Sequence, residues 1–388
     1  MDHDLSPEAN TLRDMVRAFL ERKSSESDVR RVIETGMGRD DDVWQQMAVQ
    51  LGLQGLLVPE ELGGQGSSFV EVSVVLEELG RSLLPGPFFS SAVLATSALL
   101  ATDDAAAREL LGELASGQRV ATVAFSEGVT GRPDESTVVA READSSWVLD
   151  GQIDIVLDAQ AVDVLLVVAR TGRDVGLFTV PASEHGVSIT PLRTLDQTRQ
   201  AGRVELTDVV ARCVGRNFAE AQRHVLSLAA AGLAAELAGV TQRVLEMAVD
   251  YAKLREQFGV PIGSFQAVKH LCAEIFCTAE SATAVARHAA RMASDEPASL
   301  ALAASLAKAY ASQACAEAAE KNIQIHGGIG YTWEHPAHLY LRKAKAGEML
   351  FGDSARHRQN LGGLLGLTAG AEVVSIAGAV VLDQRVGV

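Results

Sequence analysis

The stretch YAKLREQFGVPIGSFQ, residues 251–266, joins two long segments that are rich in Ala and Leu and have helical periodicity. Gly and Pro interrupt the periodicity within the stretch, so we expect a short turn between two helices there. A second motif, QIHGGIG at 324–330, ends a later helical segment. Helical segments occupy most of the chain from Phe218 to Leu365, and they predict a C-terminal four-helix bundle over residues 215–388.

The part of the chain before this bundle has two different sequence patterns. Ser6-Pro7-Glu8 is typical of a helix start, and residues 1–118 read as a helical domain with a loop, LVPEELGGQGSS, at 57–68. Short β-branched segments separated by turns, such as VDVLLVVAR (162–170), then predict a β domain over residues 119–214. We therefore expect an α+β multidomain fold: an N-terminal helical domain, a middle β-barrel or sandwich, and the C-terminal bundle.

The composition of the 388-residue chain argues against several classes of function. Acidic residues outnumber basic ones by 50 to 34, so an extended basic surface for nucleic acid is not expected. The N-terminus MDHDLSPEAN lacks a signal-peptide pattern, and no uninterrupted apolar run reaches membrane-spanning length. The four cysteines lack zinc-type CxxC spacing, and His335 and His338 have no evident acidic third ligand. These features predict a cytoplasmic protein with reduced thiols, no metal site and no membrane partner.

The two motifs resemble signatures of the acyl-CoA dehydrogenase family, in its actinobacterial FadE-like form, and LVPEELGG resembles the family's N-terminal loop. The resemblance implies that the first motif faces the FAD of a neighbouring subunit and that the second meets the FAD pyrophosphate. The residues implied in these contacts are Arg255, Gln257, Phe258, Gln266, Gln324, Gly327 and Gly328.

Elementary chemistry is consistent with these FAD contacts. Arginine supplies paired donors to phosphate, and glycine lets backbone N–H groups approach phosphate oxygens without a Cβ in the way. An ordinary helix C-cap is the alternative for Gly327 and Gly328. The resemblance also implies an acyl-CoA thioester as substrate, an electron-transfer flavoprotein as electron acceptor, and either a homotetramer or a heterotetramer with a homologous subunit.

The catalytic turn departs from the family pattern. Most members place a catalytic glutamate in a Tyr-Glu-Gly turn after an Arg-Asp-Ala-Lys segment. This chain has Arg342-Lys343-Ala344-Lys345 followed by Leu350-Phe351-Gly352, so Phe351 stands where the base is expected. Glu348 and Asp353 flank the turn as weaker candidates. Another carboxylate is needed, because the reaction removes an α-proton while the flavin accepts hydride.

Glu236 is the candidate base, because it is the one ionisable residue between Val225 and Val240 in a helix that is apolar all round. Burial would raise the pKa of such a carboxylate. Glycines at 232 and 239, with Arg243, share its helical face and would leave room for a ligand. The alternatives are an ion pair with Arg243 or with a basic residue of another helix, or a place at a subunit interface.

The β domain departs from the family where it should face the flavin ring. The resemblance assigns Phe125 and Ser126 to the flavin side, and the Ser126 hydroxyl can still form a hydrogen bond. Ile155 and Leu157 stand in a strand where the family has Trp and Thr, so an indole and a hydroxyl are lost.

Two functions follow from this uneven match. The first is an FAD-dependent acyl-CoA dehydrogenase of fatty-acid or steroid side-chain β-oxidation that uses Glu236 as base and forms a 2-enoyl-CoA. The sequence leaves a linear, branched or ring-bearing acyl group open, and moving the base would free one wall of the pocket for a bulky one. The second is a non-catalytic or half-site subunit of a heteromeric dehydrogenase, which lends Arg255, Gln257 and Gln324 to a flavin held mainly by its partner. A third, remoter function is that of a flavin oxidase of related fold, in which oxygen replaces the electron-transfer flavoprotein.

Overall fold

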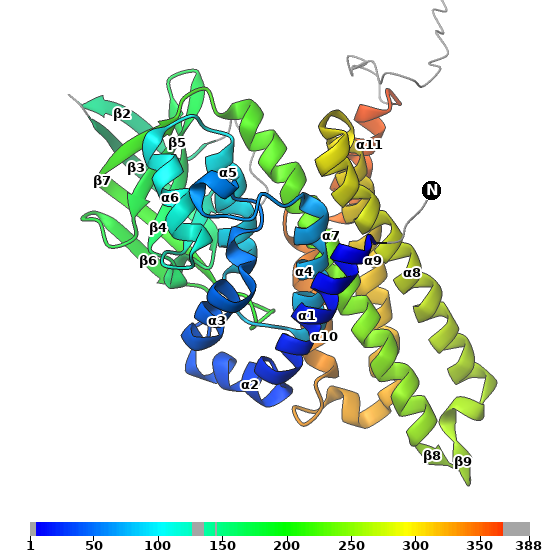
Figure 1. The fold of residues 1–388 in the computed structure, drawn as a ribbon. Helices are drawn as coiled ribbons and strands as arrows, with labels where there is room; N and C mark the ends of the chain where they lie inside the picture. Colours follow the sequence, from blue (N-terminus) through cyan, green and yellow to red (C-terminus); the bar gives the residue numbers. More distant parts are fainter. Residues whose placement is uncertain (1–4, 126–135, 144–145, 368–388) are drawn as a thin grey trace, which may run out of the picture.

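A computed structural model describes residues 5–125, 136–143 and 146–367 and shows a helical, a β and a second helical part in succession (Figure 1). The predicted helix start is confirmed: the Ser6 hydroxyl accepts a hydrogen bond from the Ala9 backbone N–H at 3.1 Å, and Pro7 is the first helical residue. The N-terminal part contains α1 (Pro7–Lys23), α2 (Glu26–Thr35), α3 (Asp41–Leu51), α4 (Phe69–Ser82), the π-helix η3 (Phe89–Ala95), α5 (Thr96–Leu100) and α6 (Ala105–Ala115).

The middle part is a β-sheet that closes on itself. Its strands are β1 (Ala121–Ala124), β2 (Val139–Ala143), β3 (Ser146–Leu157), β4 (Val164–Thr171), β5 (Asp174–Pro181), β6 (Val187–Pro191) and β7 (Ala201–Gly215). The order is β1-β4-β2-β3-β7-β5, and β5 pairs with β4 again, which closes a barrel. β6 pairs with β7 outside this path. All of β4 except its last two residues is buried, which explains its continuous apolar run.

The C-terminal part is the predicted helical bundle. It contains α7 (Ala219–Leu254), α8 (Gln266–Asp295), α9 (Leu300–His326), α10 (Ala337–Met349) and α11 (Ser354–Leu364). A hairpin of β8 (Glu256–Gln257) and β9 (Val260–Pro261) joins α7 to α8 and projects beyond the bundle (Figure 1). The fold class expected from the sequence is therefore confirmed.

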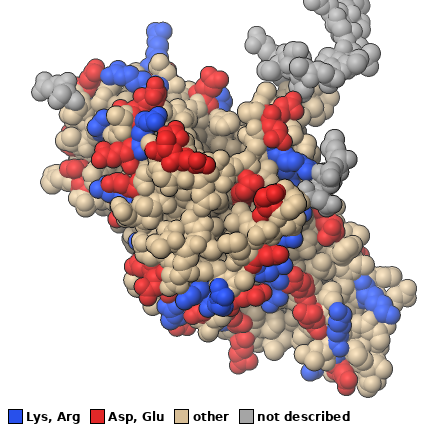
Figure 2. All heavy atoms as spheres, in the orientation of Figure 1, with Lys and Arg blue, Asp and Glu red and all other residues tan. Residues whose placement is uncertain are grey.

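Helix α7 is the central element of the molecule. It packs against α4 of the first part and against α8, α9 and α10 of the bundle. Among the described helices it alone is long and apolar enough to cross a membrane, but 83% of its most apolar window is buried inside the protein, as in a core helix. On the face in Figure 2, acidic and basic side chains are interspersed.

Candidate functional site

Phe351 lies in the turn between α10 and α11 with its side chain inside the protein. Only 7% of the residue is exposed, and its ring centroid is 5.7 Å from that of Phe89 in the π-helix. The backbone of Phe351 has a φ of 56°, a left-handed conformation that is rare for a bulky residue. The turn is held by the buried Lys308 amine, which donates to the Gly352 carbonyl at 2.8 Å, and by His357 Nε2, which donates to the Phe351 carbonyl at 2.9 Å.

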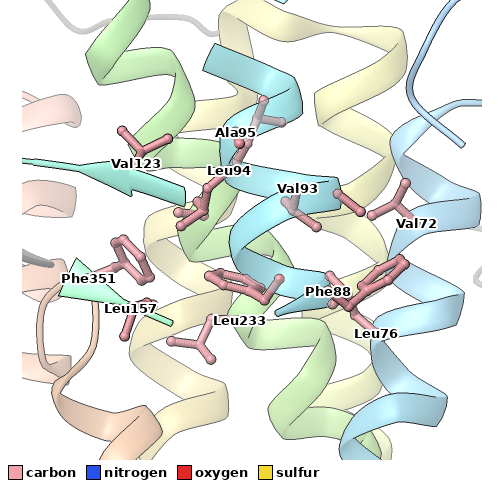
Figure 3. Close-up of a cluster of buried hydrophobic side chains, with 14 of the residues drawn as sticks. Val72, Leu76, Phe88, Val93, Leu94, Ala95, Val123, Leu157, Leu233 and Phe351 are labelled. Atoms are coloured by element: carbon pink, nitrogen blue, oxygen red, sulfur yellow. The ribbon is translucent and has the colours of Figure 1, made fainter. Parts of the chain in front are cut away.

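The two positions that depart from the family belong to one apolar cluster. Figure 3 shows Leu157, from the end of β3, and Phe351 in the same group of buried side chains, which also includes Leu233 of α7. Leu157 is 4% exposed. The core is therefore filled where the resemblance expects a catalytic carboxylate and a polar contact to the flavin ring.

Glu236 is buried as predicted, at 4% exposure, but it is paired with two cations. Its carboxylate accepts hydrogen bonds from Arg199 at 2.7 and 2.9 Å and forms an ion pair with Lys343 at 2.8 Å. Burial alone would raise the pKa of Glu236, but the charges of Arg199 and Lys343 outweigh it and lower the pKa to about 2. The predicted upward shift is therefore wrong, because the carboxylate is not alone. Its role as a base stays a prediction.

Glu236, its two partners and Asp196 form a buried charged group, which we call the Glu236 cluster: Asp196, Arg199, Glu236 and Lys343. Lys343 also lies 3.5 Å from Asp196, so two carboxylates meet two cations inside the protein. The Arg199 guanidinium also lies over the Phe89 ring, 5.0 Å from its centroid. Of the expected alternatives, the pair with Arg243 is wrong, because Arg243 pairs with Glu246 at 3.1 Å. The pair with a basic residue of another helix is confirmed by Lys343 of α10.

The glycine face beside Glu236 holds no ligand space, contrary to the prediction. A Cβ at Gly239 would lie 1.8 Å from the backbone oxygen of Glu77 in α4, and one at Gly232 would lie 3.1 Å from Leu76 and 3.3 Å from Phe89. These glycines let α4 approach α7 closely. The cavity that Glu236 lines has a volume of about 20 Å³, enough for about one water molecule.

The two sequence motifs, 251–266 and 324–330, lie together at one end of the bundle. Arg255, Gln257 and Phe258 are exposed in and beside the β8–β9 hairpin, and 93% of Phe258 is accessible. Gln266 is exposed as the first residue of α8. Gln324 is exposed in the last turn of α9, at the same end.

The two glycines of the second motif have different environments: the C-cap alternative is confirmed for Gly327, and the phosphate contact stays a prediction. Gly327 is the C-cap of α9 and has a φ of 62°, which favours glycine whatever else it contacts. A Cβ at Gly328 would meet nothing within 4 Å in this chain, so internal packing does not explain that glycine. The open space beside it fits the approach of a phosphate group to the backbone. We call the exposed residues Arg255, Gln257, Phe258, Gln266, Gln324, Gly327 and Gly328 the lending end.

Two aromatic contacts tie the motifs to each other. The Tyr251 ring of α7 stacks on the His326 ring of α9 with centroids 4.3 Å apart. The His326 ring in turn lies 4.3 Å from that of His335. No sequence pattern predicts this stack, because Tyr251 is distant from the two histidines along the chain and its contact with them depends on how α7 and α9 pack.

The remaining candidates have other roles or places. Phe125 is buried, at 2% exposure, and Ser126 lies outside the described residues. Asp353 caps α11 by accepting from the Arg356 N–H at 2.8 Å, and Glu348 lies 3.8 Å from Lys345. Within the described ranges, no three His, Cys, Asp or Glu side chains are grouped to hold a metal.

Sequence reasoning missed Arg199 and Lys343. Lys343 did carry a signal, because it replaces the Asp of the family's Arg-Asp-Ala-Lys segment and so brings a cation to an inward position. Arg199 carried none, since it lies in a loop between β6 and β7.

Comparison with known proteins covers nearly the whole chain. The family model "Acyl-CoA dehydrogenase, N-terminal domain" matches residues 6–118, and "Acyl-CoA dehydrogenase, C-terminal domain" matches residues 218–364. The acyl-CoA dehydrogenase IpdE2 of Mycobacterium tuberculosis is 33% identical over 88% of this chain and 92% of its own length. The chain belongs to the acyl-CoA dehydrogenase family.

Other members of the acyl-CoA dehydrogenase family extend this result. Acyl-CoA dehydrogenase FadE34 of M. tuberculosis is 40% identical over 79% of this chain, but the match spans only 40% of FadE34. Among solved structures, the ChsE4-ChsE5 complex from M. tuberculosis is 28% identical with a TM-score of 0.87, covering 95% of this chain and 100% of the matched chain. The Tcur3481-Tcur3483 steroid ACAD is 30% identical with a TM-score of 0.83, covering 93% and 98%.

Proposed function

We propose that this chain is a subunit of a heteromeric acyl-CoA dehydrogenase, in which its lending end contacts FAD held mainly by a homologous partner. The observation that carries the proposal is the contrast between the lending end and the position where the family has its catalytic base. The exposed end has its Arg, Gln and Gly residues open to solvent, whereas the place of the base is occupied by the buried Phe351 ring.

The interior argues against a substrate site of the chain's own. The reaction needs a carboxylate of suitable basicity beside an acyl group. Glu236 is neutralised by Arg199 and Lys343, and a pKa of about 2 makes it a weak base. The cavity beside it, about 20 Å³, has no room for an acyl chain.

The lending end supports contact with FAD from another subunit. Arg255 offers paired donors, and Gln257 and Gln324 offer amides, all on a surface open to a second chain. FAD, when bound, accepts the hydride from the β-carbon of the acyl-CoA. The partner subunit then has to supply the base and the acyl pocket, and an electron-transfer flavoprotein would receive the electrons.

The relatives support an enzyme made of two different subunits with different roles. Two similar structures carry names of two components, ChsE4-ChsE5 and Tcur3481-Tcur3483, and the latter is described as a steroid ACAD. The match to FadE34 leaves 60% of that longer protein without a counterpart here, since it covers 40%. We therefore propose a bulky, ring-bearing acyl-CoA as the substrate of the assembled enzyme.

The test is a substitution made only in this chain of the complex that it forms with a homologous subunit. Arg255→Ala should remove most of the bound FAD, measured from the flavin absorbance per complex, while the complex keeps its mass. Arg203→Ala is the matched control, because Arg203 is a half-exposed arginine of the β domain. Full flavin content in Arg255→Ala would contradict the proposal.

A further inference from the structure

Two residues of the lending end, Arg255 and Gln324, lie at the ends of separate helices. Arg255 follows the last turn of α7, whereas Gln324 lies in the last turn of α9. Residues 253 to 261 are all exposed, so the hairpin has little packing of its own. Two groups that must contact one ligand need a fixed separation, because the cost of ordering them on binding lowers affinity.

The Tyr251–His326–His335 stack lies at the roots of both segments. The Tyr251 carbonyl accepts a hydrogen bond from the Arg255 N–H at 2.8 Å, and the Arg255 carbonyl accepts from the Ile262 N–H at 2.7 Å. Tyr251 therefore lies directly beneath the hairpin. His326 stands between Gln324 and Gly327 in the second motif.

The orientation of the His326 ring is fixed from several sides. Its Nδ1 donates to the Asn322 carbonyl at 2.8 Å, and only 4% of the residue is exposed. Tyr251 covers one side of the ring, and His335 is tilted against it at 44°. His335 is itself held, because its Nδ1 accepts from the Ala337 N–H at 3.2 Å at the start of α10.

We propose that Tyr251, His326 and His335 form a joint that holds Arg255 and Gln324 in register, so that both contact the same FAD. The inference rests on the proposed function and names the residues that position its contact set. The three side chains are positioning residues: they act through the hairpin and the Gly327–Gly328 segment. Offset or tilted ring pairs of this kind prefer defined geometries, which suits a joint between helix ends.

The test is a titration of FAD into the flavin-free complex with the homologous partner. Tyr251→Ala should raise the Kd for FAD about tenfold, which corresponds to about 1.4 kcal/mol at 25 °C. Tyr251→Phe keeps the ring and should stay within about twofold of wild type by the same scale. Tyr310→Ala is the control, because Tyr310 lies on α9 away from its end and is 39% exposed. Complex mass is followed in parallel.

Each outcome decides a separate point. Wild-type affinity in Tyr251→Ala, or equal weakening in Tyr251→Ala and Tyr310→Ala, would overturn the joint. If Tyr251→Ala does not assemble, His335→Ala decides in the same titration, because His335 is only partly buried and closes the stack from outside. If the Kd for FAD is unchanged in Arg255→Ala, the proposed function is wrong. If the Kd rises in Arg255→Ala but not in the variants of the Tyr251–His326–His335 stack, only the joint is wrong.

Discussion

Lys343 and Lys345 are neighbours on α10 with different environments. The Lys343 side chain is 4% exposed and lies 2.8 Å from Glu236, whereas the Lys345 side chain is 40% exposed and pairs with Glu320 on the surface. The two residues therefore form a matched pair for measuring what the Glu236 cluster contributes to stability.

Lys343→Met should lower the free energy of unfolding by about 3–5 kcal/mol, because it leaves two buried carboxylates with one cation. Lys345→Met should cost at most about 1 kcal/mol, since solvent screens an exposed pair. Urea unfolding of both variants measures the difference. Equal losses in the two variants would show that the cluster is not a buried ion network.

The pH dependence of stability gives a second test of Glu236. Its pKa is lowered from 4.5 to about 2, so the carboxylate stabilises the fold fully above pH 4.5 and loses this contribution as the pH falls toward 2. The contribution is on the order of 3 kcal/mol, at about 1.4 kcal/mol per pH unit. Glu236→Gln should flatten this part of the stability profile, measured by urea unfolding at each pH. An unchanged slope would contradict the ion pairing.

The sequence could locate Glu236 but not its partners. Its burial followed from a helix that is apolar all round, and the structure confirms it. The direction of its pKa shift did not follow, because Arg199 reaches it from a loop of another part of the chain. Local periodicity carries no information about such long-range pairs.

Among the helices, α4 and α7 pack closely through glycines on both. The glycines of α7 were expected to border a ligand, but Gly239 instead accommodates the backbone of Glu77, and Gly80 of α4 accommodates the backbone of Glu236. A helix face lined with glycine has the same sequence pattern in both cases. Only the neighbouring helix distinguishes a ligand pocket from close helix packing.

Gly239→Ala should lower the free energy of unfolding by about 1–3 kcal/mol, because its Cβ would lie 1.8 Å from the Glu77 oxygen and force the helices apart. Gly112→Ala in α6 is the comparison, because its Cβ would lie 3.2 Å from the Leu62 carbonyl oxygen, which needs a shift of only a few tenths of an ångström. Thermal or urea unfolding compares the two. A Gly239→Ala variant as stable as wild type would mean that the α4–α7 contact adjusts at little cost.

Most elements could be predicted from local patterns, and one could not. The helix start at Ser6 follows from a helix-start motif, and the buried strand β4 follows from a β-branched run. The π-helix over Phe89–Ala95 carries no signature of its own, because its wider turn depends on what packs against it. That turn brings Phe89 to Phe351 and so helps to fill the core.

The molecule as a whole combines an apolar core around Phe351 with an exposed lending end. The sequence predicted which residues belong to the two motifs, and the structure shows that the motifs share one end of the bundle (Figure 1). It could not predict that Leu157 and Phe351 join one apolar cluster, because that depends on how the barrel and the bundle dock (Figure 3).

We propose that this chain has no complete flavin site of its own. The most direct measurement is the visible spectrum of the chain purified by itself with added FAD, followed by anaerobic addition of straight, branched and ring-bearing acyl-CoAs. We expect a colourless protein after removal of free FAD and no bleaching with any thioester. A yellow protein that bleaches with an acyl-CoA would contradict it and restore Glu236 as the first candidate for the base.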